Sequence, residues 1–289
     1  MPELPEVETV RRGLSTLIVG KTIQSEQHDT PKGFPNTPAD VSAFLIGANI
    51  IGVHRRAKVL MIELDNQYSL IIHLKMTGQL VYVDPTTRFG AGHPNDSLVN
   101  ALPDKSTRVS LLFNDGSTLF FNDQRKFGWV KLLPTSEILL LPFMQKVGPE
   151  PLADDFTAEQ FAARFKRRAR TSIKAALLDQ SVIAGVGNIY ADESLWGAKI
   201  HPSRLVGSIT SDEFQKLYEE VRTVMNLSIE KGGSSNSTYV NAEGKRGSYM
   251  DFARVFRREG QACPRCGTTI EKLRVAGRGT HICPHCQQI

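Results

Sequence analysis

Residues 58–83 read KVLMIELDNQYSLIIHLKMTGQLVYV and contain three short apolar runs. The runs cover residues 58–64, 68–74 and 79–83, and an Asp-Asn pair separates the first two. Runs of this length that are bounded by turn residues are typical of β-strands. Further runs of the same kind cover residues 108–113, 117–121 and 129–133. We therefore predict an all-β domain here, either a sandwich or a barrel.

A helix is predicted in front of these strands. Its apolar residues recur at steps of three and four: Leu4, Val7, Val10, Leu14 and Leu17. This spacing is that of an amphipathic helix, and Pro5 suits its first turn. Residues 85–106, which follow the third strand, are rich in Pro, Gly, Asn, Asp and Ser, and we interpret them as a loop.

The second half of the chain shows helical periodicity. It begins after KVGPEPLADDF (146–156), a proline-rich hinge. The segments predicted to be helical are residues 156–179, with a break near residue 170, residues 192–200, and residues 211–233, which end in two glycines. Residues 234–250 are polar and rich in Gly and Ser, and we predict a mobile loop there.

The cysteines form two Cys-x2-Cys pairs separated by 16 residues. They are Cys263, Cys266, Cys283 and Cys286. Two such pairs suit one tetrahedral zinc ion in a β-hairpin ribbon, whereas two disulfides are the alternative in an oxidising compartment. Because four thiolates complete the shell, we expect a structural zinc ion and no ligand role for His281 or His285.

The composition is that of a globular protein whose charge favours an anionic partner. The chain of 289 residues is 40% hydrophobic and carries a net charge of +5. No apolar run approaches the length of a bilayer span, and acids stand where a signal peptide would carry positive charge. We therefore expect a cytoplasmic protein of one large or two medium domains, and a polyanion as its partner.

Two segments and one arginine favour contact with phosphate groups. RFKRRARTSIK (164–174) is strongly basic, although a solvated helix face has the same composition. AGVGNIYADE (184–193) places two glycines in a tight turn, so that Asn188 would begin a helix whose free N–H groups can receive a phosphate. A glycine-tightened structural turn is the alternative. Arg278 lies between two glycines and is predicted to occupy the tip of the cysteine hairpin.

The N-terminus can carry chemistry of its own. A methionine before proline is normally removed in the cell, which would expose Pro2 as a free secondary amine. Such an amine is partly neutral near pH 7, and the positive end of a helix lowers its pKa further. Its attack on a sugar C1′ gives an iminium that makes the C2′ proton acidic, and Glu3 is placed to move protons. The alternative is that Pro2 and Glu3 only begin a helix.

Several motifs occur in an order that resembles one protein family. They are MPELPEVETVRRGL, HRRAKVLMIEL, HLKMTGQL, DQRKFGW, VGPEPL, GVGNIYADESLW and the cysteine ribbon. Together they span residue 1 to about residue 287 and resemble the bacterial formamidopyrimidine-DNA glycosylases, which are 8-oxoguanine-DNA glycosylases and AP lyases. The resemblance implies an α+β fold of two domains. The N-terminal domain would be a β-sandwich flanked by helices, and the C-terminal domain would be helical, with a helix–two-turn–helix and a zinc ribbon.

The resemblance also implies the domain limits and the partners. Residues 1–134 would form the catalytic sandwich, 135–155 the hinge linker, 156–233 the helix–two-turn–helix domain, 234–252 the loop that closes over the flipped base, and 253–289 the zinc ribbon. A monomer would bind double-stranded DNA with a damaged base or an abasic site in the cleft between its domains. It would act at the nucleoid, with one structural zinc ion as its cofactor.

Activity and site residues follow by position from the same resemblance. The enzyme would remove oxidised purines, 8-oxoguanine and formamidopyrimidines, and then cut the strand by β- and δ-elimination. Pro2 would be the Schiff-base nucleophile and Glu3 the proton donor. Lys58 would assist β-elimination and contact phosphate, and Arg278 would bind phosphates and assist δ-elimination. The residues beside the lesion and in the wedge that replaces the flipped base would be Glu6, Met76, Arg125 and Phe127. The remaining DNA contacts would be Arg108, Lys126, Arg170, Lys174, Asn188 and Tyr190.

The chain departs from the family pattern at three places. Arg257 stands where glycine is common, and Arg108 follows a segment that often carries histidines, so we expect it to bind phosphate in their place. The loop reads SSNSTYVNAEG where a version with threonine and arginine is commoner, which leaves the preferred damaged base open.

Two rival interpretations remain open. An endonuclease VIII-type glycosylase would share the nucleophile but act on oxidised pyrimidines. Leu4 argues against it, because MPELPE resembles the purine branch and MPEGPE the other. A DNA-binding zinc protein without activity is the second rival, but binding alone needs none of the chemistry of Pro2, Glu3 and Lys58.

Overall fold

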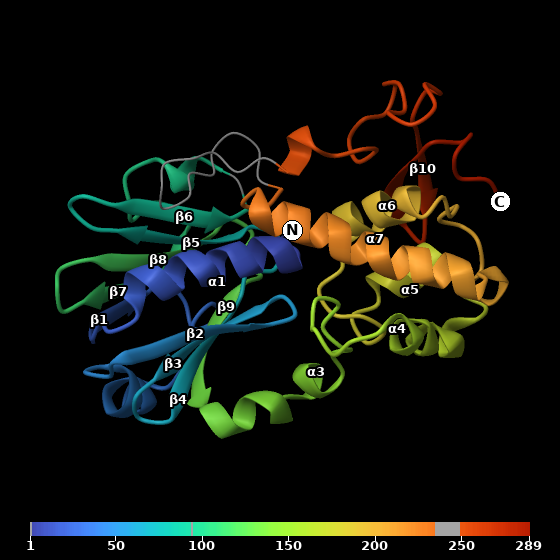
Figure 1. The fold of residues 1–289 in the computed structure, drawn as a ribbon. Helices are drawn as coiled ribbons and strands as arrows, with labels where there is room; N and C mark the ends of the chain where they lie inside the picture. The colour runs from blue at the N-terminus through green and yellow to red at the C-terminus, as the bar shows by residue number, and fades with distance from the viewer. Residues whose placement is uncertain (1, 94, 235–248) are drawn as a thin grey trace. The chain divides into compact units, whose positions relative to one another are not determined.

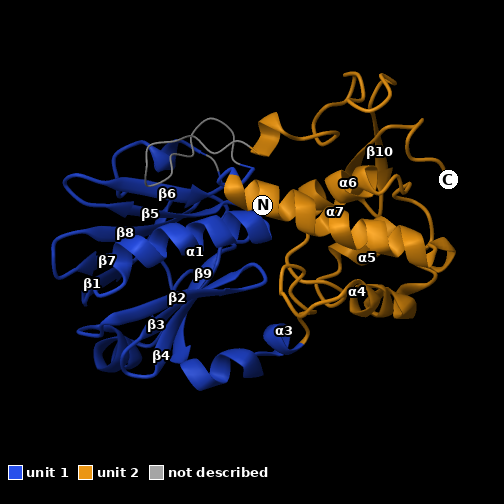
Figure 2. Ribbon diagram, in the orientation of Figure 1, with its two compact units in different colours: residues 1–145, 231–248 blue, residues 146–230, 249–289 orange. Residues whose placement is uncertain are grey.

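The chain of the computed structural model separates into two compact units (Figure 2). The structure describes residues 2–93, 95–234 and 249–289. Unit 1 comprises Met1–Gln145 and Lys231–Ser248, and unit 2 comprises Lys146–Glu230 and Tyr249–Ile289. The first division falls within the segment predicted to be a hinge. Each unit collects two stretches of chain, and the finer domain limits stay a prediction.

Unit 1 is built on two antiparallel sheets (Figure 1). The larger sheet has the strand order β1-β7-β8-β5-β6, and the smaller has the order β2-β3-β4-β9. The strands of the larger sheet are β1 (Ile23–His28), β5 (Gly78–Val83), β6 (Arg88–Gly92), β7 (Thr107–Phe113) and β8 (Thr118–Asp123). Those of the smaller sheet are β2 (Ile50–Arg56), β3 (Val59–Leu64), β4 (Tyr68–His73) and β9 (Trp129–Pro134). Side chains of both sheets, such as Ile62 and Phe121, share one buried core, so the predicted sandwich is confirmed.

The prediction of a loop over residues 85–106 is wrong in part, because β6 lies inside it. This strand reads RFGAG and has no β-branched residue, but it pairs with β5 from Gln79↔Gly92 to Val83↔Arg88. A Cβ on Gly92 would lie 2.5 Å from the Gly78 carbonyl oxygen, so the close pairing itself requires glycine. Tertiary pairing therefore makes a strand where local composition indicates a loop.

Helix α1 (Leu4–Ile18) packs against both sheets of unit 1. Four residues of the predicted apolar face, Leu4, Val7, Val10 and Leu14, are fully buried, and the fifth, Leu17, is partly buried. A Cβ on Gly13 would lie 2.1 Å from the Phe89 ring, so glycine allows the helix to approach β6 closely. Pro5 lies in the first turn, and Glu3 is the N-cap residue. The helix therefore fixes the first residues of the chain on the sandwich.

The other described helices of unit 1 are short, whereas unit 2 holds two longer helices, α6 and α7, several short ones and two strands. Unit 1 also holds α2 (Pro38–Asp40), η1 (Val41–Leu45), η2 (Asp96–Leu98), η3 (Thr135–Leu140) and α3 (Pro142–Gln145). Unit 2 holds α4 (Ala158–Phe165), η4 (Lys166–Arg168), α5 (Ile173–Leu178), α6 (Asn188–Gly197), η5 (Val206–Ser208), α7 (Ser211–Glu230), η6 (Tyr249–Asp251), β10 (Glu271–Val275) and β11 (Arg278–Ile282). None of the described helices combines the length and apolar character that crossing a bilayer requires.

Capping explains the helix limits in unit 2. Thr157 caps α4 by accepting from the Gln160 backbone N–H, and Ser172 caps α5 in the same way. The predicted break near residue 170 is therefore a helix end followed by a new start. Asn188 is the first residue of α6, as predicted, and Gly187 is its N-cap. Strands β10 and β11 form the hairpin predicted between the cysteine pairs.

Candidate active site

The first candidate residues lie together at the start of α1. Pro2, Glu3 and Glu6 are buried. The Glu3 backbone N–H donates to Glu6 Oε2 at 2.8 Å, so the two acids form a capping box at the helix start. Glu6 Oε1 accepts from the Ser234 backbone N–H at 2.9 Å. The predicted nucleophile and acids thus adjoin the first residues of the predicted loop, whose residues 235–248 lie outside the described part of the chain.

Lys58 lies in a second element of unit 1, the two-residue turn between β2 and β3. Its side chain is largely buried, and the preceding Ala57 has a positive φ of 52°. His73 of β4 pairs with Val59, directly after this lysine. Burial, together with the charges of Lys75 and Lys58, lowers the pKa of His73 to about 3. A neutral imidazole that feels the charges of two ammonium groups suits a site for an anionic ligand, and His73 is a candidate that the sequence analysis did not single out.

The predicted wedge residues belong to two turns that one carboxylate joins. Asp123 is fully buried, and its Oδ2 accepts from the Phe127 and Gly128 backbone N–H groups at 2.9 and 2.7 Å. Its Oδ1 accepts from the Arg125 N–H at 3.2 Å and from the Thr77 hydroxyl. Thr77 directly follows Met76, so Asp123 holds both turns side by side.

The same turn exposes an aromatic ring and a cation. Phe127 is 47% exposed, and the Arg125 guanidinium lies 4.9 Å from its ring centre. Lys126 is also exposed and adopts a positive φ of 56°, and its Nζ lies 3.4 Å from Asp29 Oδ2. An exposed ring next to arginine is the chemistry expected of a group that enters a base stack. Met76 is half-buried at the neighbouring turn.

Arg108 is placed differently from an exposed phosphate ligand. It is 6% exposed, and its guanidinium donates to the Asp123 and Lys105 carbonyl oxygens at 2.8 and 2.7 Å. A further N–H of Arg108 donates to the Asp29 carboxylate. Burial alone would raise the pKa of Asp29, but the hydrogen bond and the charge of Arg108 hold this pKa below its ordinary value. In this structure Arg108 braces the turn that carries the wedge residues.

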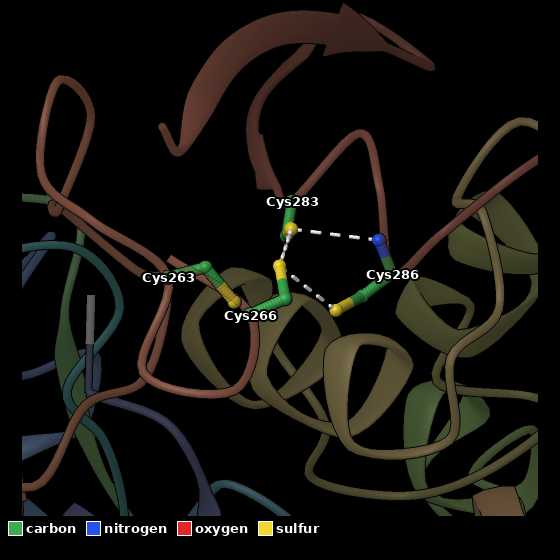
Figure 3. Close-up of side chains that lie close together, drawn as sticks. All are labelled: Cys263, Cys266, Cys283 and Cys286. Atoms are coloured by element: carbon green, nitrogen blue, oxygen red, sulfur yellow. Dashed lines mark hydrogen bonds between the residues drawn. The ribbon is translucent and has the colours of Figure 1, made fainter. Parts of the chain in front are cut away.

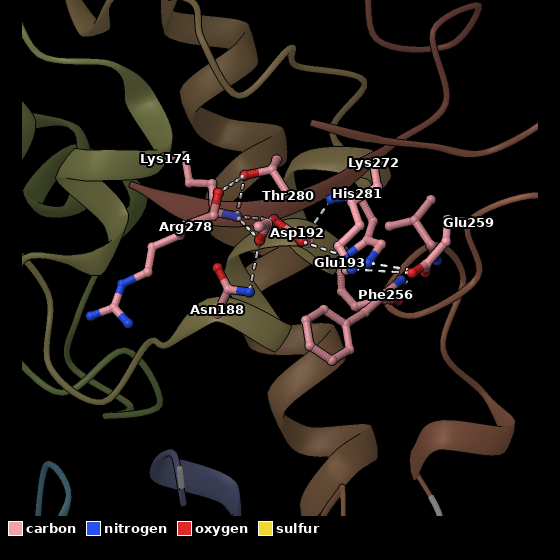
Figure 4. Close-up of polar contacts among 12 residues, drawn as sticks. Lys174, Asn188, Asp192, Glu193, Phe256, Glu259, Lys272, Arg278, Thr280 and His281 are labelled. Atoms are coloured by element: carbon pink, nitrogen blue, oxygen red, sulfur yellow. Dashed lines mark hydrogen bonds and ion pairs between the residues drawn. The ribbon is translucent and has the colours of Figure 1, made fainter. Parts of the chain in front are cut away.

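In unit 2, Arg278 is exposed at the start of β11, and the residues around it hold the hairpin in place (Figure 4). The carbonyl oxygen of Gly279 accepts from Lys174 Nζ at 3.2 Å and from Asn188 Nδ2 at 3.0 Å. Lys174 Nζ also donates to Thr280 Oγ1 at 2.7 Å. The arginine side chain extends away from this cluster, as Figure 4 shows.

Asp192 completes the cluster and was not among the predicted site residues. Its Oδ1 lies 2.6 Å from Lys174 Nζ, and both side chains have no exposed surface. Its Oδ2 accepts from the His281 backbone N–H at 2.9 Å and lies 3.2 Å from His281 Nδ1. Lys174 is thus buried in an ion pair, which favours a role in fixing the hairpin over direct contact with phosphate.

Other predicted DNA contacts in unit 2 divide into buried and exposed. Tyr190 is fully buried, and its hydroxyl lies 2.5 Å from Ser228 Oγ. Arg170 is exposed after the basic 3-10 turn. Glu193, next to Asp192, is a further residue that the sequence analysis did not single out. Its buried carboxylate accepts from the backbone N–H groups of residues 254, 255 and 256 at 2.8–2.9 Å.

The four cysteines converge on one point in unit 2 (Figure 3). Their sulfur atoms all lie within 4.8 Å of one another, and all four are free of disulfides. Thiolates at about 2.3 Å from a central ion in a tetrahedron have this spacing, so the set fits zinc. Cys263 and Cys283 are buried in a cluster with Trp196 of α6, which ties the ribbon to the helices. The predicted zinc-binding site is therefore confirmed, and the cluster found among the described residues consists of the four cysteines.

Comparison with known proteins identifies relatives over the whole chain. The family model described as Formamidopyrimidine-DNA glycosylase N-terminal domain matches residues 1–130. The H2TH domain of the same enzymes matches residues 147–240, and the zinc finger found in FPG and IleRS matches residues 260–289. The formamidopyrimidine-DNA glycosylase of Herpetosiphon aurantiacus is 44% identical over 99% of this chain and 100% of its own. The enzyme of the same name from Streptococcus mutans is 40% identical over the full length of both chains.

Solved structures of the same kind share the fold. The complex between Lactococcus lactis Fpg and a DNA with an abasic site has a TM-score of 0.87 and 36% identity, covering 99% of this chain and 100% of that one. A structure of MutM with DNA that contains carbocyclic 8-oxo-G has a TM-score of 0.85 and 35% identity, covering 100% of both chains. The similarity therefore includes proteins whose bound DNA is seen directly.

Proposed function

The chain belongs to the formamidopyrimidine-DNA glycosylase family and is a base excision repair glycosylase with AP lyase activity, and we propose that Pro2 is its nucleophile. Its partner is DNA with a damaged base or an abasic site. The observation that carries the proposal for Pro2 is the position of this residue, buried at the start of α1 and followed by the Glu3–Glu6 capping box. The oxidised-pyrimidine alternative and the inactive DNA-binding alternative have no comparable support, since the relatives named above are formamidopyrimidine-DNA glycosylases.

The proposed reaction forms and breaks bonds in a fixed order. The free amine of Pro2 attacks C1′, a bond forms between nitrogen and C1′, and the glycosidic bond breaks as its electron pair leaves with the protonated base. The new ammonium then loses its proton, and the C1′–O4′ bond breaks as O4′ takes its electron pair and a proton, so that the opened sugar carries an iminium between nitrogen and C1′. This iminium withdraws electrons from C2′. Loss of a C2′ proton then expels the 3′ phosphate, and a second elimination expels the 5′ phosphate. Glu3 is the proposed group that supplies and accepts protons, because it directly follows the amine.

Other residues are proposed to hold the DNA during these steps. Lys58 and Arg278 contact phosphates beside the lesion, and the Arg125–Phe127 turn enters the gap left by the flipped base. Flipping costs a few kcal/mol, which the wedge and the backbone contacts offset. Oxidised purines are the proposed substrates, since the solved relatives are bound to DNA that contains 8-oxo-G and Fapy-dG.

The zinc ribbon and the location complete the proposal. One zinc ion per chain is expected, because four cysteines form a single cluster with no open ligand position among the described residues. The ion supplies stability and no bond-breaking chemistry. We also propose that the enzyme acts as a monomer in the bacterial cytoplasm, where chromosomal DNA is located.

The test uses purified protein whose N-terminal mass confirms a free Pro2. The protein is mixed with borohydride and a duplex that carries 8-oxoguanine opposite cytosine. We expect a covalent adduct that peptide mapping assigns to Pro2, because borohydride reduces the iminium. The control is the same protein with Met1 retained, which has no free proline amine and should give no adduct. Free Pro2 without an adduct, in a preparation that still binds the duplex, would contradict the proposal.

A further inference from the structure

The turn that carries Lys58 has an unusual backbone. Strands β2 and β3 pair up to Arg56↔Val59, so Ala57 and Lys58 form the whole turn. Ala57 adopts a φ of 52°, in the left-handed region that disfavours a residue with a Cβ, and it is only 4% exposed. A conformation of this kind persists only where the surrounding contacts hold it, and it is found most often at functional sites.

Arg55 supplies one such contact. Its Nη1 donates to the Ala57 carbonyl oxygen at 2.9 Å, and its Nε donates to Glu8 Oε2 at 3.1 Å. The arginine side chain is 11% exposed, so both bonds lie largely out of water. The planar guanidinium thereby connects the turn rigidly to helix α1.

Glu8 is a well-fixed anchor for this connection. Its carboxylate also accepts from Arg11 Nη2 at 2.8 Å and from Arg12 Nε at 2.9 Å, and its side chain is 12% exposed. Burial alone would raise the pKa of Glu8, but the hydrogen bonds from the three arginines lower it to about 2. The carboxylate therefore stays ionised at neutral and mildly acidic pH.

The anchor belongs to the helix that begins at the active site. Glu8 follows Glu3, the N-cap of α1, by five residues, which is about 8 Å along the axis. The contacts from Glu8 to Arg55, and from Arg55 to the Ala57 carbonyl, thus run between two rigid elements. One of them carries Pro2 and Glu3, and the other carries Lys58.

We propose that the Glu8–Arg55 pair is a positioning clamp, which holds Ala57 in its left-handed conformation and thereby fixes Lys58 relative to Pro2 and Glu3. The inference rests on the proposed function, because it gives Arg55 a role through Lys58. Arg55 is a positioning residue and does not itself touch the substrate. A left-handed turn residue is most often glycine, whereas this turn has alanine. With the clamp, the hydrogen bond from Arg55 holds the conformation that glycine would adopt without help.

The main test compares Arg55→Lys with the control Arg12→Gln. Lysine keeps the charge of Arg55 but lacks the rigid, planar set of donors with which the guanidinium holds the Glu8 carboxylate and the Ala57 carbonyl in fixed directions. Arg12 donates to the same carboxylate from an exposed position on α1. The rate of strand scission is measured in a single turnover on a duplex with a preformed abasic site. Arg55→Lys should slow it about tenfold or more, because displacement of a reacting group by about 1 Å can cost about 100-fold in rate. Arg12→Gln should match the wild type.

A second variant, Ala57→Gly, separates positioning from stability. Glycine adopts a positive φ without cost, so the melting temperature should stay within about 3 °C of the wild type or increase. Strand scission should nevertheless become slower, since the turn gains conformational freedom. A faster or unchanged rate in this variant would contradict the clamp.

The decisive comparison is the double variant Arg55→Lys/Lys58→Met. If Arg55 acts through Lys58, the double variant should be as slow as Lys58→Met alone. A general loss of structure would instead multiply the two effects. A wild-type protein that forms no borohydride adduct overturns the proposed function and the clamp with it. If the wild type forms the adduct, the clamp alone is overturned by either of two results. One is an Arg55→Lys variant that cuts at the full rate, and the other is a double variant in which the effects of Arg55→Lys and Lys58→Met multiply.

Discussion

Single buried carboxylates organise both units of this protein. The Asp123 carboxylate accepts hydrogen bonds from the backbone N–H groups of residues 125, 127 and 128. The Glu193 carboxylate accepts from those of residues 254–256. A buried carboxylate without such donors would carry a large desolvation cost, so each one specifies the loop around it. These residues are therefore part of the construction of the site even though they are remote from the chemistry.

The environment of Glu8 predicts an acid-dependent loss of stability. The folded-state pKa of about 2 lies below the ordinary value of 4.5, so this carboxylate stabilises the fold fully above pH 5 and loses its effect as the pH falls from about 4.5 to about 2. The contribution at neutral pH is about 3 kcal/mol in the free energy of unfolding. Urea unfolding from pH 7 to pH 2.5 should show the wild type converging on Glu8→Gln at the acidic end. The exposed control Glu137→Gln should differ little from the wild type throughout, and a constant gap between wild type and Glu8→Gln would refute the assignment.

Sequence motifs identified the residues at the start of α1 and the cysteines. They did not identify the buried carboxylates that hold the Arg125–Phe127 turn and the Arg278 hairpin in place. Pro2, Glu3 and the Cys-x2-Cys pairs are local patterns with a chemical meaning of their own. Asp192 acquires its role from the Lys174 ammonium and the His281 backbone N–H, which lie 18 and 89 residues away in the sequence. Asp123 joins its own turn to that of Thr77, 46 residues away. Lys174 shows the same limit: a basic run predicts phosphate contact, whereas a hairpin more than 100 residues later buries this lysine.

At the scale of elements, the sequence analysis did not predict β1, β2 or β6, and the local signals of β1 and β6 are weak. The edge strand β1 reads IQSEQH, has one buried side chain and pairs with β7 alone. Such a strand lacks the alternation that sequence analysis depends on. Helices with clear capping residues and apolar periodicity, such as α1 and α7, agree with the prediction. Pairing with another strand, β7 for β1 and β5 for β6, therefore forms these strands where local composition does not indicate them.

The hairpin that presents Arg278 should depend on the buried Lys174–Asp192 pair. Asp192→Asn leaves a buried ammonium without its counter-charge, which costs about 3–5 kcal/mol. We expect the melting temperature to fall by about 10 °C and the affinity for abasic-site DNA to fall about tenfold. Binding is measured by titration of a labelled duplex below the melting temperature.

A comparison with Arg278→Ala shows whether the effect passes through the hairpin. In the Arg278→Ala background, Asp192→Asn should reduce DNA affinity little further. Thr280→Val is the milder companion, since it removes only one acceptor of Lys174. Full additivity of Asp192→Asn and Arg278→Ala would show that the pair does not act by placing the arginine.

At the scale of the whole molecule, the zinc site should support unit 2 and leave unit 1 intact. Cys263 and Cys283 pack with Trp196, whereas the other tryptophan, Trp129, lies in β9 of unit 1. Removal of zinc exposes these thiols and the Trp196 ring to water, because the ribbon depends on the metal for its fold.

Metal removal is therefore expected to change the fluorescence emission of Trp196 and to leave that of Trp129 unchanged. With Trp129→Phe, the emission of Trp196 should shift to longer wavelength when a chelator removes the metal, and affinity for abasic-site DNA should fall by about 100-fold or more. With Trp196→Phe, the emission of Trp129 should stay unchanged. Equal shifts of both tryptophans would mean that the metal stabilises the sandwich as well.

The division of the chain into units also has a consequence for its synthesis. Every described strand of unit 1 ends by Pro134, whereas the zinc ligands begin only at Cys263. A ribosome therefore delivers every described strand around Pro2 before it delivers the thiols that unit 2 requires. The nascent chain can pack α1 against both sheets while the hairpin that carries Arg278 does not yet exist. With the roles proposed above, an incomplete polypeptide would hold its nucleophile in place but would lack the arginine that contacts phosphate.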